Sequence, residues 1–248
     1  MRRHSVSSLL TAALAAGGFA LTTPGCADND SMMFVVGVMA VEANCTVRPD
    51  ATALLQARGV LDREFTTGYT GALLVGNQIT QRGSREQLRT ETSRVALRGA
   101  EVILQTPAGA QLAEFSTVGT GFVDPAAGAD PSYAAMFVDM IPPSVSPSLP
   151  DGRVVARVRV FGDTLGGEEI TSSELAFPID VCTGCLIFYP AEAADPTQAT
   201  FMCQANVATA GTETDTLPCE PGQDQLISCT LCAATHPMCR DPALNPSL

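Results

Sequence analysis

The nine cysteines of this chain are the residues whose chemistry is clearest. Cys26 and Cys45 lie in the N-terminal fifth of the sequence. If Cys26 takes no part in a disulfide, eight cysteines remain. An even number of cysteines in an exported chain is typical of a disulfide framework. Seven of these eight are concentrated near the C-terminus: Cys182, Cys185, Cys203, Cys219, Cys229, Cys232 and Cys239.

The pairing of eight cysteines has roughly a hundred solutions, and the sequence does not select one. Cys45 follows the first predicted strand and Cys182 follows the last, so Cys45 could pair with Cys182 or Cys185 and fasten the C-terminal segment to the rest of the chain. A Cys203–Cys219 bridge would stabilise the fold by about 3 kcal/mol through loop closure. We expect such cross-links because residues 182–248 contain few large apolar side chains for a core.

Two Cys-x-x-Cys motifs, at 182–185 and 229–232, leave two alternatives open. The first is a zinc site that includes His236, although the gap 186–228 is longer than the usual spacing of about 15–20 residues. The second is thiol–disulfide exchange at 182–185, which normally requires a helix N-terminus. The Leu-Ile-Phe-Tyr-Pro run at 186–190 is a poor helix former, so the sequence favours structural disulfides and predicts no metal or cofactor.

Other chemistry has little support in the sequence. His236 is the only histidine besides His4, and no Gly-x-Ser-x-Gly motif is present, so we expect no serine hydrolase and no enzyme. Oxygen ligands for calcium are a further possibility, since acidic residues flank two turns rich in Gly or Pro. This alternative, a calcium-dependent adhesin-like module, would use Asp124, Asp130, Asp139, Asp163, Glu168 and Glu169.

The N-terminus has the features of an export signal. Arg2 and Arg3 precede an apolar run from Leu9 to Leu21, which is too short to span a bilayer. The Gly25-Cys26 sequence that follows resembles the lipobox of bacterial lipoproteins. The resemblance implies that residues 1–25 are removed and that Cys26 carries the acyl chains of a stable membrane anchor. Ordinary signal cleavage after Ala27 is the alternative.

The composition restricts the partners of the chain. The formal net charge is −12 with 14 basic residues, all of them arginine, and such an acidic chain is a poor ligand for nucleic acid. Tryptophan is absent, which weakens a lectin-like role. Arginines within 81–99 and 153–159 could form a patch for an anionic glycan or an envelope protein, or they could line the solvated face of a sheet.

Residues 33–181 have the pattern of a β-protein. In 153–161, Val154 and Val158 alternate with Arg153 and Arg157, which predicts a strand with one buried and one solvated face. A capping-box pattern makes 84–94 the one candidate helix, with a loop as the alternative. The fold predicted is all-β, an immunoglobulin- or fibronectin-like β-sandwich with a small disulfide-rich C-terminal extension. Its strands are expected at 33–41, 54–61, 69–79, 94–106, 110–118, 133–140, 153–161 and 175–181.

The sequence therefore predicts a signal peptide (1–25), a lipidated tether (26–32), a β-sandwich domain (33–181) and a cysteine-rich C-terminal region (182–248). This arrangement resembles uncharacterised lipoproteins of high-GC Gram-negative bacteria. The resemblance implies a non-enzymatic structural or binding module in the cell envelope, anchored by the lipid on Cys26. Ala27 after the cysteine resembles the pattern for sorting to the outer membrane. A thiol-redox or metal-binding envelope protein is the alternative.

Overall fold

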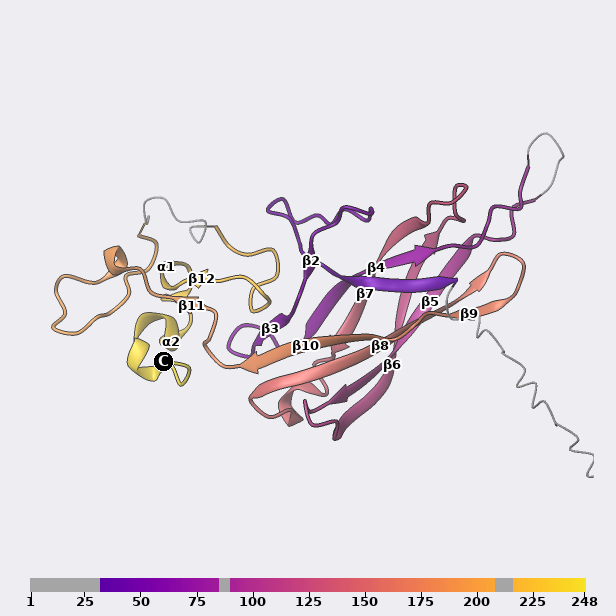
Figure 1. The fold of residues 1–248 in the computed structure, drawn as a ribbon. Coiled ribbons are helices and arrows are strands. Elements are labelled where there is room, and N and C mark those ends of the chain that lie inside the picture. Colours follow the sequence, from indigo (N-terminus) through magenta and orange to yellow (C-terminus); the bar gives the residue numbers. More distant parts are fainter. Residues whose placement is uncertain (1–31, 85–89, 208–215) are drawn as a thin grey trace, which may run out of the picture.

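The computed structural model describes residues 32–84, 90–207 and 216–248 (Figure 1). Strands dominate this part of the chain, and its two α-helices, α1 (Cys229–Cys232) and α2 (Pro237–Arg240), are each about one turn long. The predicted all-β class is therefore confirmed. Within the described residues, no helix has both the length and the apolarity needed to cross a membrane.

The first main sheet has four strands in the order β2-β1-β4-β7, and every neighbouring pair is antiparallel. The second main sheet has the order β3-β10-β8-β5-β6, with β9 paired to β8. In this six-stranded sheet β3 is parallel to β10, and the other pairs are antiparallel. The strands of the four-stranded sheet are β1 (Met33–Met39), β2 (Leu55–Gln56), β4 (Tyr69–Asn77) and β7 (Ser132–Ile141). Those of the six-stranded sheet are β3 (Gly59–Asp62), β5 (Val95–Gln105), β6 (Gln111–Val123), β8 (Gly152–Thr164), β9 (Glu169–Thr171) and β10 (Leu175–Cys182).

One apolar cluster joins the two sheets, which together we call the body. In β8 the predicted alternation is confirmed, because Val154 and Val158 are fully buried while Arg153 and Arg159 are exposed. Side chains of β4 and β7, such as Leu73 and Val138, belong to the same cluster. Burial of these apolar side chains between the sheets is the main stabilising contribution to the body.

The outer faces of the two sheets differ in chemistry. On the six-stranded sheet, Arg153 forms an ion pair with Asp180 (Nε–Oδ1 2.8 Å), and Arg157 forms one with Glu174. On the four-stranded sheet, Leu74 belongs to a small apolar cluster that residues of the 40–54 loop cover. The arginine-rich side of β8 is therefore a solvated sheet face whose charges are paired.

The segment after β10, residues 182–248, has a small core of its own in which buried cysteines take part. It contains a short parallel pair, β11 (Ile187–Phe188) with β12 (Ile227–Ser228), followed directly by α1. The Ser228 side chain caps α1 by accepting a hydrogen bond from the Thr230 amide. Short 3-10 helices lie in the body and in this C-terminal segment: η2 (Ser146–Ser148), η3 (Ala191–Ala193) and η5 (Pro242–Leu244).

Two expected elements differ in the structure. The predicted strand 54–61 is divided, because the chain passes from the four-stranded sheet at β2 to the six-stranded sheet at β3. The candidate helix 84–94 is wrong for residues 90–94, which are not helical, and 85–89 lie outside the described residues. The Glu91 carboxylate instead accepts hydrogen bonds from the amides of Gly83 and Ser93.

Candidate functional site

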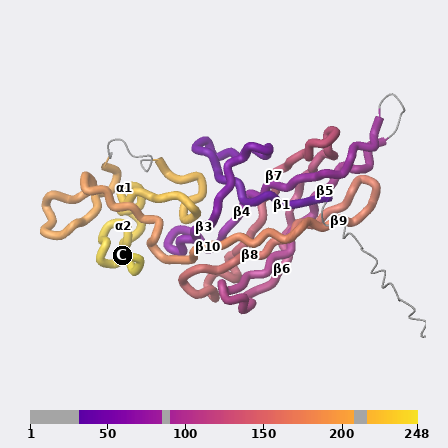
Figure 2. Tube along the Cα trace, viewed as in Figure 1, coloured from indigo at the N-terminus to yellow at the C-terminus, as the bar shows by residue number. Residues whose placement is uncertain are grey.

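The C-terminal segment meets the body at the end where β3 and β10 finish and β4 begins (Figure 2). Residues 182–186 and 219–225 form most of the hydrogen bonds between the C-terminal segment and the body. This junction contains a Cys-x-x-Cys motif, the fully buried Asp62 and a pair of neighbouring carboxylates, Glu220 and Asp224. No other part of the described structure combines these groups, so we treat the junction as the candidate site.

One disulfide fastens the C-terminal segment to the body across a long stretch of sequence. Cys45, in the loop after β1, is bonded to Cys219 (Cα–Cα 5.4 Å). The expected bond from Cys45 to Cys182 or Cys185 is therefore wrong. Cys45 follows a strand of the four-stranded sheet, whereas Cys182 ends a strand of the six-stranded sheet and is bonded to Cys185.

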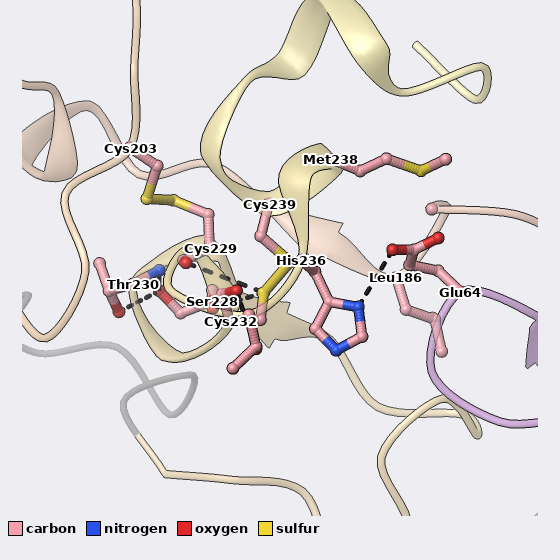
Figure 3. The surroundings of a disulfide bond; sticks show 12 residues. Glu64, Leu186, Cys203, Ser228, Cys229, Thr230, Cys232, His236, Met238 and Cys239 are labelled. Carbon is pink, nitrogen blue, oxygen red and sulfur yellow. Dashed lines mark hydrogen bonds and ion pairs between the residues drawn. A yellow bond between two sulfur atoms is a disulfide. The ribbon is translucent and has the colours of Figure 1, made fainter.

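Two further disulfides lie inside the C-terminal segment (Figure 3). Cys203 is bonded to Cys229, and Cys232 to Cys239, so the expected Cys203–Cys219 bond is also wrong. Cys229 and Cys232 begin and end α1, and each has its own partner outside the motif. The two Cys-x-x-Cys motifs therefore do not share one zinc site in this structure, in which all eight cysteines beyond Cys26 are oxidised.

Asp62 is the central polar residue of the junction. It ends β3 and is completely buried. Its Oδ1 accepts hydrogen bonds from the amides of Gly184 (2.7 Å) and Glu64 (3.0 Å), and its Oδ2 accepts one from Leu186 (2.9 Å). Three such bonds to a charged acceptor compensate for the loss of hydration of a buried carboxylate. Asp62 thus fixes the loop that contains Cys182 and Cys185.

The same carboxylate lies beside two sulfur atoms. One oxygen of Asp62 and the sulfurs of Cys182 and Cys185 all lie within 4.8 Å of one another. The parallel pairing of β3 with β10 explains this proximity, because it places Cys182 opposite Asp62. Among the described residues, this is the one group of three potential metal ligands that meets this distance.

The four disulfides close loops of very different length. Cys182 and Cys185 are 3 residues apart, whereas Cys45 and Cys219 are 174 residues apart. In the chain-entropy model these separations correspond to stabilisation of about 2 and about 5 kcal/mol, respectively. The Cys182–Cys185 bond therefore contributes little to stability through loop closure, and the Cys45–Cys219 bond contributes much.

A second acidic group, Asp224, joins the segment to the body from the other side of the junction. Its Oδ1 accepts a hydrogen bond from the Val60 amide (2.7 Å), and its Oδ2 accepts one from the hydroxyl of the buried Tyr69 (2.9 Å). Burial raises the pKa of Asp224, and burial together with the charge of Asp224 raises the pKa of nearby Glu220. Burial also raises the pKa of Tyr69, so its hydroxyl stays protonated and donates.

A cavity of about 200 Å³ lies at this second group. Its walls come from the chain after β1, from β2 and from the 219–225 stretch of the C-terminal segment, with Gln56, Glu220 and Asp224 among the lining residues. The sequence analysis missed Asp62, Glu220 and Asp224. Nothing in their spacing distinguishes them from the other acids of this chain, because the contacts that bury them are long-range.

His236 also belongs to the junction. Its Nδ1 lies 3.0 Å from an oxygen of Glu64 (Figure 3). Its ring also packs against the Phe65 ring, with 5.0 Å between the centroids. Both partners follow β3 in the body. His236 thus helps to attach the C-terminal segment to the body.

Three of the six candidate calcium ligands of the sequence analysis have protein partners in the structure. Asp124 pairs with Arg94 (2.6 Å) and Asp163 with Arg98 (2.9 Å), and Asp139 accepts a hydrogen bond from Thr70. The same ion pairs use two of the arginines proposed for an anionic ligand. The other acids of that proposal, Asp130, Glu168 and Glu169, are not part of the metal-ligand group found in the described residues.

Cys26, the predicted lipidation site, lies outside the described residues. No protein-family model matches the chain, and no curated protein matches it.

Proposed function

We propose that this chain is a lipid-anchored lipoprotein of a Gram-negative cell envelope that acts, without catalysis, as a structural or protein-binding module. Its body would be an immunoglobulin-like β-sandwich, and residues 182–248 would be a disulfide-rich extension. The observation that carries the proposal is the use of the cysteines. Eight of the nine are bonded in four disulfides, which leaves Cys26, the residue of the lipobox-like sequence, as the ninth.

The strand order supports an immunoglobulin-type sandwich. In such folds strands A, B and E share one sheet, while G, F, C and C′ follow in order in the other. Here β1, β4 and β7 are neighbours in the four-stranded sheet, and β10, β8, β5 and β6 follow in order in the six-stranded sheet. The strand β3, which pairs in parallel with β10, corresponds to the second half of a first strand divided between two sheets.

The position of the first described strand supports an orientation on the membrane. Met33 begins β1, and β1 runs toward the end of the body that bears the C-terminal segment (Figure 1). The described chain therefore starts at the opposite end. A tether of residues 26–32 spans at most about 25 Å. A lipid on Cys26 would hold the starting end close to the bilayer and direct the C-terminal segment away from it, toward envelope proteins or glycans.

A labelling experiment tests the anchor. The full-length chain and its Cys26→Ser variant are expressed in a Gram-negative host with a radiolabelled fatty acid, and membrane and soluble fractions are compared. The proposal expects label on the wild-type chain, in the outer-membrane fraction, and loss of both label and membrane association in the variant. An unlabelled wild-type chain that begins after Ala27 would contradict it.

A further inference from the structure

We propose that the Cys182–Cys185 disulfide is redox-active and that its reduced form, together with Asp62, binds a thiophilic divalent cation such as Zn²⁺. The inference concerns the junction alone and does not depend on lipidation. It assigns a chemical role to one of four disulfides and a structural role to the other three.

The junction brings three potential ligand atoms close together. Asp62 is held by the amides of Gly184 and Leu186, and its carboxylate lies within 4.8 Å of both sulfurs. Thiolate sulfur and carboxylate oxygen are ordinary Zn²⁺ ligands, at about 2.3 Å and about 2.0–2.2 Å. The Cα atoms of Cys182 and Cys185 are 6.0 Å apart, so the sulfurs can separate and surround an ion by side-chain rotation. Three protein ligands leave a fourth tetrahedral position for water or another molecule.

Hydrogen bonds also hold the loop in place, independently of the disulfide. The Arg63 amide donates a hydrogen bond to the Cys182 carbonyl (2.9 Å), and the buried Asn245 side chain donates one to the Gly184 carbonyl (2.8 Å). Together with the hydrogen bonds to Asp62, these contacts hold the residues on both sides of the two sulfurs. Reduction would therefore yield two thiols in a preformed loop.

The other disulfides are less suited to reversible reduction. Cys203–Cys229 and Cys232–Cys239 are buried in the core of the C-terminal segment, whereas Cys182 and Cys185 are only partly buried. Cys45–Cys219 is partly exposed but closes the longest loop. A disulfide that strongly stabilises the folded state is correspondingly harder to reduce in that state.

The redox step needs a dithiol reductant, which in the envelope would be a protein with a reactive thiol pair. Its thiolate attacks one sulfur of the disulfide, and the other sulfur leaves and takes a proton. The second thiol of the reductant then resolves the mixed disulfide. The reductant is oxidised to its own disulfide, and two electrons and two protons pass to Cys182 and Cys185. Binding of Zn²⁺ then displaces the two thiol protons.

The first test is the order of reduction. The purified full chain in detergent is equilibrated in dithiothreitol redox buffers of graded potential, alkylated, digested and mapped by mass spectrometry. We expect Cys182 and Cys185 to be alkylated at potentials where the buried pairs and Cys45–Cys219 remain oxidised and the far-ultraviolet circular dichroism is unchanged. Reduction of this pair only together with unfolding would overturn the proposal.

The second test is metal binding by the selectively reduced protein. Cd²⁺ reports on thiolate ligation through its ultraviolet charge-transfer absorbance, and Zn²⁺ competes for the same site. We expect one Cd²⁺ per chain in the wild type and in Asp180→Asn, which removes a carboxylate from the outer face of β10. The charge-transfer band should be absent from the Cys182→Ser/Cys185→Ser variant. This variant loses only the disulfide that closes the shortest loop.

The Asp62→Asn variant tests the third ligand. Loss of a residue that only orients a metal ligand already lowers metal affinity by about tenfold or more. We therefore expect loss of a direct ligand to lower Zn²⁺ affinity by at least about tenfold. Equal affinity in wild type and Asp62→Asn, or an unchanged charge-transfer band without the two cysteines, would overturn the assignment. If Asp62→Asn is poorly folded, the charge-transfer band of the double cysteine variant still decides whether Cys182 and Cys185 bind the metal.

Discussion

The buried carboxylate of Asp62 should make a large contribution to the stability of the junction. Asparagine in its place keeps one oxygen but presents an NH₂ group where a second oxygen accepts from Leu186. One hydrogen bond to a charged acceptor is lost, a buried amide loses its partner, and the remaining bonds to Gly184 and Glu64 lose their charge assistance. With about 1.5–3 kcal/mol for each bond to a charged group, we expect a loss of about 3 kcal/mol.

Amide hydrogen exchange measures this loss where it occurs. If opening of the 182–186 loop controls exchange, about 3 kcal/mol corresponds to exchange about 100-fold faster at Gly184 and Leu186 in Asp62→Asn. Urea unfolding followed by circular dichroism gives the accompanying loss of global stability. Both measurements are made on the oxidised protein, so that the redox state of the cysteines is the same in every variant.

Asp180→Asn is the matched control, because Asp180 lies on β10 two residues before Cys182 and forms ion pairs with Arg153 and Arg58 on the outer face. Ion pairs of this kind contribute about 0–1 kcal/mol. The reasoning would be refuted if exchange at Gly184 in Asp62→Asn stayed within about twofold of wild type. It would also be refuted if Asp180→Asn accelerated the same amides equally.

Three further predictions concern the junction and the core. Replacing Cys45 and Cys219 with serine should lower the free energy of unfolding by about 5 kcal/mol in urea titrations, and a loss below about 1 kcal/mol would contradict loop closure as the cause. Burial raises the pKa of Asp224, so the folded state holds this proton more tightly, and stability falls as the pH rises from the ordinary carboxyl range through the raised value. Between about pH 4 and about pH 8, the melting temperature should therefore fall less in Asp224→Asn than in wild type. An equal fall in both proteins would contradict a raised pKa of Asp224. Gly162→Ala should destabilise the body by about 3 kcal/mol in urea unfolding, because its Cβ would lie 2.4 Å from the Ala96 carbonyl oxygen, and a neutral effect would show that the strands separate easily.

Sequence patterns over a few residues predicted those parts of the fold that depend on interactions between neighbouring residues in the chain. The alternation of Val154 and Val158 with arginines identified β8, since side chains of a strand point alternately to the core and to water. The even number of cysteines beyond Cys26 indicated disulfide bonds, which the structure contains. The strand 54–61 was only partly predicted, because its apolar residues give no sign that the chain changes sheet between Gln56 and Gly59.

The site could not be predicted in the same way, because it depends on contacts between distant parts of the chain. Nothing in the sequence around Asp62 marks it as a functional residue. Its role arises only when β3 pairs with β10, which places Asp62 opposite Cys182, 120 residues further along the chain. Asp224 likewise meets Tyr69 across 155 residues. The sequence analysis paired Cys45 with Cys182 or Cys185 because these residues follow the first and last strands. It missed Cys219 because strand positions do not show where the chain beyond Cys185 comes back into contact with the body.

The most direct test of the proposed function is the intact mass of the protein purified from membranes, measured with and without reduction before alkylation. The account predicts a chain that begins at Cys26 with acyl chains attached, no alkylated cysteine other than Cys182 and Cys185 without reduction, and eight alkylated cysteines after full reduction. A chain that begins after Ala27 without acyl groups, or thiols of the other six cysteines that react without reduction, would contradict a lipid-anchored module held together by structural disulfides.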